Sequence, residues 1–302
     1  MITPVSPPSS YTYFPGCSLM ATNRAYDRST RVVARELGVE LTELADWNCC
    51  GATAYLPIRE KRAFVLSARN LAIAEQAGRE LATVCNACYV VLRKTNKYMA
   101  EDAHLRADIR RALRAGGLDY SGSVRVRHFL DIVVNDVGPE RVRARVRRDM
   151  SAWKVACYCG CQLSRPFDDL DDPEYPELMA RLVAWLGAEA VPFPMSAKCC
   201  GGMAMTTHPE TGRLLTGKIL KAARDRAADC VATACPLCQI NLEAYQDQAG
   251  RAVGARCDIP VLYFTQLLGI AFGLPSVELA LRDNLTSLEP LLAGKGCHDH
   301  VE

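Results

Sequence analysis

The chain has 302 residues, of which 49% are hydrophobic and 23% charged, and its net charge at pH 7 is +2. The length suffices for one large domain or two smaller ones, and the composition excludes the disordered and collagen-like classes. The even charge balance excludes the basic surface of a nucleic-acid-binding protein. The unusual feature is a count of 15 cysteines, which a chain of this length does not need as disulfide staples.

Strands and helices are predicted to alternate along the first half of the chain. Short β-prone runs predict strands, and longer runs of helical composition that end at a glycine predict helices. The predicted order is strand 11–14, helix 23–37, strand 39–44, helix 59–77, strand 80–84 and a further helix after Cys88.

The second half predicts the same order. Its elements are strand 154–156, a helix around 176–186, strand 189–193, helix 210–227 and strand 230–234. Alternation of this kind is typical of βαβ units with a parallel sheet. We therefore expect an α/β fold of two duplicated halves, each a small parallel sheet flanked by helices, with cysteine loops at the carboxyl ends of the strands.

The cysteines reveal an internal repeat. Cys49-Cys50-Gly51 recurs as Cys199-Cys200-Gly201, and the Cys-x-x-Cys at 85–88 recurs at 235–238, both 150 residues later. In each half 34 residues separate the adjacent pair from the Cys-x-x-Cys. The repeat predicts two homologous domains, residues 1–150 and 151–302.

Each half also has an earlier cysteine. Gly16-Cys17-Ser18-Leu19 matches Gly160-Cys161-Gln162-Leu163, which selects Cys161 in the second half, although Cys157 and Cys159 lie close to it. Because loops after parallel strands meet at one edge of a sheet, five thiols should converge in each half. A structural zinc ion or a cubane [4Fe–4S] cluster takes four ligands, so five favour a multi-iron centre of unusual shape.

This pattern resembles the B subunit of heterodisulfide reductase and the wider family with tandem cysteine-rich CCG domains. The resemblance covers nearly the whole chain and implies two non-cubane [4Fe–4S] clusters, which cleave or form a disulfide where the two halves meet. The ligands that it implies are ten cysteines: Cys17, Cys49, Cys50, Cys85 and Cys88 for one cluster, and Cys161, Cys199, Cys200, Cys235 and Cys238 for the other. Cys157 stays a possible alternative to Cys161.

Several other residues invite a role but have a simpler interpretation. Cys230 falls in a predicted strand and is expected to be a buried small residue, and Cys257 has no partner at ligand spacing. The tail with Cys297, His298 and His300 has a metal-like composition, and disorder is the simpler interpretation. His128 could supply a proton, but we expect a structural histidine there, and the same holds for His104 and His208.

The chain has no nucleotide-binding glycine motif and no ferredoxin-type cysteine run, so electrons must pass through a partner. By resemblance, the partners are the ferredoxin-like (C) and flavoprotein (A) subunits of the same complex. The arginines between 141 and 148 could dock an acidic partner, or simply form a solvated helix face.

The expected function is that of an oxidoreductase acting on sulfur groups, with a disulfide or lipoate-bound sulfur as substrate. An alanine- and arginine-rich, lysine-poor composition favours the bacterial, sulfur-oxidising version. The alternatives are a CCG subunit of an organic-acid or quinone oxidoreductase and a zinc-binding scaffold, with zinc in one half. Family members of the first kind usually carry a single CCG half or a fused ferredoxin part, unlike this chain. With no secretory signal and no apolar run near ~20 residues, we expect a cytoplasmic protein without a transmembrane segment.

Overall fold

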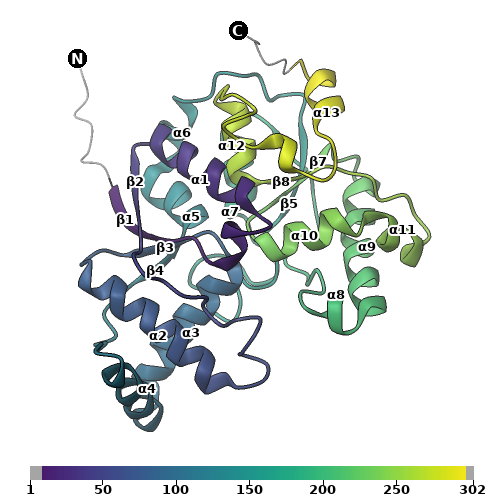
Figure 1. Cartoon of the computed structure of the whole chain (residues 1–302). Coiled ribbons are helices and arrows are strands. Elements are labelled where there is room, and N and C mark those ends of the chain that lie inside the picture. Colours follow the sequence, from purple (N-terminus) through teal and green to yellow (C-terminus); the bar gives the residue numbers. More distant parts are fainter. Residues whose placement is uncertain (1–8, 297–302) are drawn as a thin grey trace, which may run out of the picture.

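The computed structural model describes residues 9–296, which form two four-stranded parallel sheets with helices packed on both faces (Figure 1). The first sheet has the spatial order β2–β1–β3–β4, and the second has the matching order β6–β5–β7–β8. The first comprises β1 (Ser9–Phe14), β2 (Val39–Glu43), β3 (Leu81–Thr83) and β4 (Val126–His128). The second comprises β5 (Lys154–Tyr158), β6 (Glu189–Ala190), β7 (Cys230–Thr233) and β8 (Val261–Tyr263).

Helices connect the strands, as the long crossovers of a parallel sheet require. Those of the first half are α1 (Arg24–Glu36), α2 (Glu60–Gln76), α3 (Asn86–Glu101), α4 (Ala103–Ala115), α5 (Phe129–Asp131) and α6 (Gly138–Arg143), with single turns at Cys17–Met20 and Ile132–Val137. Those of the second half are α7 (Leu178–Trp185), α8 (Ala204–Thr207), α9 (Pro209–Asp225), α10 (Pro236–Ala244), α11 (Gln246–Val253), α12 (Phe264–Ala271) and α13 (Glu289–Gly294), with a turn at Leu281–Asp283.

Helix α1 illustrates how the sequence sets these elements. Tyr26, Thr30 and Val33 are buried and lie three or four residues apart, so they share one face of the helix. On the more exposed side, Arg31 pairs with Asp27 at 2.8 Å. The helix ends before Gly38, whose φ of 65° is the left-handed conformation that glycine adopts easily.

The two sheets share a core. Tyr13 of β1 and Val155 of β5 face one continuous apolar cluster, to which helices α1, α5, α7 and α12 contribute. Within it the rings of Tyr26 and Tyr263 stack with their centroids 3.9 Å apart. Figure 1 shows α1 and α12 side by side between the sheets, while α2–α4 and α8–α11 lie on the outer sides. The halves therefore bury each other's inner helices.

The predicted α/β class with duplicated parallel sheets is confirmed. Three details differ from expectation. The third helix begins at Asn86, between the two cysteines of Cys-x-x-Cys, and the predicted strand 189–193 covers only Glu189–Ala190. The fourth strands, β4 and β8, were not predicted, because three buried residues are too few to display an alternation.

The boundary at residue 150 stays a prediction. The first sheet ends at His128 and the second begins at Lys154, on either side of it. Among the described helices, none is both long and apolar enough to cross a membrane.

Candidate functional site

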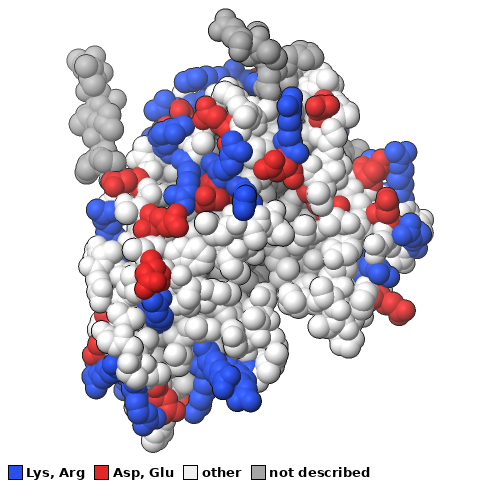
Figure 2. Space-filling model, in the orientation of Figure 1, with Lys and Arg blue, Asp and Glu red and all other residues white. Residues whose placement is uncertain are grey.

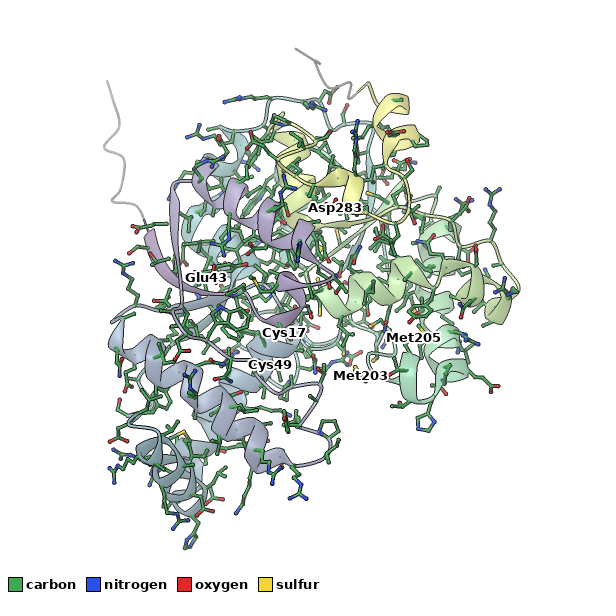
Figure 3. All side chains as sticks on the ribbon, viewed as in Figure 1. Cys17, Glu43, Cys49, Met203, Met205 and Asp283 are labelled. Carbon is green, nitrogen blue, oxygen red and sulfur yellow. The ribbon has the colours of Figure 1, made fainter. Side chains whose placement is uncertain are left out.

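The candidate cysteines follow the carboxyl ends of the strands in both sheets. In the first half Cys17 lies in the turn after β1, Cys49 and Cys50 follow β2, and Cys85 comes just after β3. The strand order reverses at β1, and the crevice at such a point is where open parallel sheets bind ligands. Figure 3 shows Cys17 and Cys49 next to one another at this edge.

The thiols of the first half meet in pairs. The Sγ atoms of Cys17 and Cys49 are 3.6 Å apart, and those of Cys50 and Cys88 are 3.3 Å apart. Cys85 interacts with Cys88 within its Cys-x-x-Cys. All five predicted residues are therefore brought together, with Cys17 exposed and Cys50, Cys85 and Cys88 buried.

The second half repeats these contacts. Cys161 hydrogen-bonds Cys199, the Sγ atoms of Cys200 and Cys238 are 3.5 Å apart, and Cys235 interacts with Cys238. Of the three candidates in the segment after β5, the structure thus places Cys161 in the position that Cys17 holds in the first half.

Each half favours the thiolate at the same position, the first cysteine of the adjacent pair. The neighbouring thiol of Cys161 lowers the pKa of Cys199 to about 6, and the Gly201 N–H donates to its Sγ at 3.4 Å. Cys17 likewise lowers the pKa of Cys49, whose Sγ accepts from the Gly51 N–H at 3.5 Å. Thiolates are the nucleophilic and metal-binding form of cysteine.

The two sets meet at the first cysteine of each Cys-x-x-Cys. Cys85 and Cys235 interact directly, both are buried, and the hydrogen bond from Cys235 is the main cause that lowers the pKa of Cys85. Cys85 is the N-cap residue of α3 and Cys235 that of α10. Both helices thus direct the positive ends of their dipoles at this contact, where negative charge on sulfur is stabilised.

Two asparagines tie the cysteine segments of one half to the other. The Asn86 side chain donates to the carbonyl of Cys159 at 2.7 Å, and that of Asn23 donates to the carbonyl of Pro236 at 3.3 Å. Both acceptors lie within the opposite cysteine segments, so the contact between the two sets is fixed by paired hydrogen bonds. The sequence analysis missed both residues, although Asn86 lies inside a Cys-x-x-Cys.

The glycine before the first cysteine is required in both halves. Gly16 and Gly160 have φ values of 78° and 75°. A Cβ on Gly16 would lie 3.1 Å from the Sγ of Cys88, and one on Gly160 would lie 3.2 Å from the Sγ of Cys238. A side chain would therefore strain the backbone and press on the thiols.

The surplus cysteines lie away from the two sets. Cys157 and Cys159, two residues apart on an extended segment, both point into the shared core. Cys230 is fully buried in β7 and Cys257 is buried beside α9, where its thiol approaches the Gly217 carbonyl. Cys297 and the tail histidines lie outside the described residues.

His128 is buried where the two halves meet. Its Nδ1 accepts from the Leu130 N–H at 3.2 Å, which caps α5, and its ring packs edge-on against Tyr89. Its Nε2 is buried without a hydrogen-bond partner, and burial lowers the pKa of His128 to about 4. His128 is thus a neutral structural residue, whereas His104 and His208 are exposed at the starts of helices.

The arginine-rich stretch is partly used within the fold. Arg141 donates to the Leu37 carbonyl at the end of α1, and Arg145 lies 3.8 Å from Glu36. The backbone N–H groups of Arg147 and Arg148 donate to the Ala271 carbonyl at the end of α12. This stretch therefore joins the inner helices of the two halves.

The chemistry open to this site is that of clustered thiols. Within residues 9–296, no group of three or more Cys, His, Asp or Glu side chains is arranged to hold a metal ion. The ten thiols form successive pairs along the two strand edges and meet at Cys85 and Cys235. Thiolates spread in this way are donors for soft metals at several points, and they are nucleophiles toward sulfur.

Comparison with known proteins finds the duplicated pattern. A family model described as CCG, cysteine-rich domain, matches residues 11–93 and 155–243. The 8-methylmenaquinol:fumarate reductase membrane anchor subunit of Wolinella succinogenes is 33% identical over 277 residues, which cover 91% of this chain and 96% of that protein.

Two archaeal proteins are also similar. The B subunit of the ferredoxin/F(420)H(2)-dependent CoB-CoM heterodisulfide reductase of Methanosarcina acetivorans is 29% identical, covering 90% of this chain and 92% of that one. A protein of Archaeoglobus profundus named as like the heterodisulfide reductase B subunit is 28% identical, covering 89% and 93%.

One solved structure shares the fold. A hypothetical protein from Helicobacter pylori superimposes with a TM-score of 0.72 at 14% identity. The match covers 93% of this chain and 53% of that one, so this chain spans about half the length of that protein. At this identity the likeness concerns the fold alone.

Proposed function

The chain belongs to the CCG cysteine-rich domain family, and from this premise we propose that it is the catalytic iron–sulfur subunit of a heterodisulfide reductase-like complex. The observation that carries the proposal is the pair of matched five-thiol sets that touch through Cys85 and Cys235. A thiol/disulfide reaction moves two electrons, so two adjoining redox sites suit it. Sulfur oxidation in the cytoplasm is part of the proposal.

The donor set fits iron–sulfur clusters, since such clusters are held by cysteine thiolates. The ligands would be the ten cysteines of the two sets: Cys17, Cys49, Cys50, Cys85 and Cys88, and Cys161, Cys199, Cys200, Cys235 and Cys238. When bound, two non-cubane clusters would supply the two electrons that, with two protons, convert a disulfide into two thiols. Five thiols in each half favour this form over a four-ligand site, including zinc in one half.

The residues of the chain would prepare and enclose that chemistry. The lowered pKa of Cys49 and Cys199 keeps a thiolate available in each half. The helix ends at Cys85 and Cys235 stabilise negative charge on the sulfurs between the two sites. Buried His128 is neutral, so it adds no positive charge to this contact. Electrons would come from two partners, the ferredoxin-like and flavoprotein subunits of the same complex.

The proposal is tested with the full chain prepared without oxygen. We expect about eight irons per chain, as two four-iron clusters require, and a low-temperature EPR signal that changes when a thiol is added. Replacing Cys17 and Cys49 together by serine should reduce the iron to about four per chain, whereas Cys230→Ala, which alters a cysteine outside the sets, should leave it unchanged. Two zinc ions without iron would overturn the proposal in favour of a scaffold.

A second candidate is a subunit of a quinone oxidoreductase. It is favoured by the relative from Wolinella succinogenes, whose name includes a methylmenaquinol. That relative matches this chain over both halves, so the expectation that such relatives differ in layout is not met. Reduction of the bound clusters by a menaquinol analogue, with an EPR signal that ignores added thiols, would favour this second function.

A further inference from the structure

A cavity of about 190 Å³ lies against the second set of cysteines. All five cysteines of that set line it, and none of the first set does. Its opposite wall comes from the first half, from the loop after Gly51 and from helix α3. Figure 2 shows the face between the halves hollowed and mostly uncharged, and Figure 3 places Met203, a lining residue, across the gap from Cys17 and Cys49.

The wall of the cavity is largely apolar. Leu56, Val90 and Val91 from the first half face Met203 and Leu237 from the second. Such a surface binds the hydrocarbon part of a ligand through the hydrophobic effect. The volume limits the ligand to a small molecule, since a protein cavity of about 150 Å³ is known to hold benzene.

Lys94 is the cation in this wall. It is half-buried on α3, and within residues 9–296 it makes no ion pair with Asp or Glu. Its neighbours on the same helix are paired: Arg93 contacts Asp169 at 2.7 Å and Lys97 contacts Glu101 at 3.9 Å. A half-buried ammonium group beside apolar side chains gains most from an anionic partner, and the cavity is where a ligand could bring one.

We propose that this cavity is a ligand site of the second cysteine set and takes a small organic thiol with an anionic group, which Lys94 binds. The assignment rests on the proposed function for the ligand's sulfur and on Lys94 for its anion. It also makes the duplicated halves unequal, because the first half provides the wall and the cation while the second half provides the thiols that face the ligand.

The test uses the full chain with its iron, kept without oxygen, and two probes of similar size. The probes are 3-mercaptopropionate and its uncharged amide, and EPR titration gives the dissociation constant of each. We expect the carboxylate to bind about tenfold more tightly, the worth of one charge-assisted hydrogen bond. Lys94→Gln should abolish this preference without loss of iron, and Lys94→Arg should retain it.

Two further variants keep the result interpretable. Lys97→Gln, on the same helix but lining a different cleft, should preserve the preference. Leu237→Phe should weaken both probes alike by filling the cavity. Equal binding of the two probes by an iron-loaded native chain, or a preference that survives Lys94→Gln, would overturn this assignment and leave the proposed function standing. A chain that binds no iron would instead refute the proposed function.

Discussion

His128 shows how burial fixes the charge of a single side chain beside both cysteine sets. It is fully buried, and the loss of solvation lowers its pKa to about 4 from an ordinary 6.5. Its Nδ1 already accepts the Leu130 N–H, so the neutral ring is the form that the fold uses. The histidine therefore stores a pH dependence of stability.

Between pH 6.5 and 4 the unfolded chain binds a proton at His128 that the folded chain does not. Stability from this residue is therefore complete above pH 6.5 and is lost as the pH falls. Comparing pH 6.5 with pH 5, we expect the free energy of unfolding to fall by about 2 kcal/mol more in the native chain than in His128→Asn.

Urea denaturation at the two pH values measures this difference. Asparagine can still accept the Leu130 N–H, so the variant should fold. Tyr89→Phe is the matched control, since it keeps the ring that packs on His128. Equal losses in the native chain and His128→Asn would show that the histidine does not titrate as described.

At the scale of elements, the strand–cysteine–helix unit is what builds the site. β3 leads through Cys85 into α3, and β7 leads through Cys235 into α10. The two units approach each other at these cysteines, and Asn86 closes the contact by its 2.7 Å hydrogen bond to the Cys159 carbonyl. The order of elements thus positions thiols from separate halves within reach of one another.

Asn86→Ala should lower the free energy of unfolding by about 1–3 kcal/mol, because it leaves the buried Cys159 carbonyl without its donor. It should also lower the iron content, since Cys159 precedes the segment of Cys161. Asn96→Ala is the matched control: Asn96 is on the same helix and donates to Val124 within the first half. Urea unfolding and iron analysis of both variants provide the measurement, and unchanged iron in Asn86→Ala would contradict the prediction.

At the scale of the whole molecule, the two halves are joined by a common interior. Helices α1 and α12 pack together between the sheets, with Tyr26 stacked on Tyr263. Arg35 of α1 also pairs with Glu278 of the second half at 3.2 Å. Separating the halves would expose this apolar layer to water, which is costly in proportion to its area.

We therefore expect the intact chain to unfold in one cooperative transition and each isolated half, 1–150 or 151–302, to lack one. Calorimetry and circular dichroism of the two fragments test this, and co-expression of both is the control, since the shared layer should re-form between them. A cooperative transition in either fragment alone would mean that the halves are independent domains.

The sequence by itself determined the α/β class, the duplication and the sets of cysteines, because residue spacing and strand–helix alternation are local properties. It could not choose among Cys157, Cys159 and Cys161 by chemistry, since all three are thiols. The tertiary structure turns the first two into the core and places Cys161 against Cys199. It alone also decided the Cys85–Cys235 contact, the place of Lys94 in the cavity wall and the shared core. Those features depend on which faces of distant helices pack together, and that packing is a property of the whole fold.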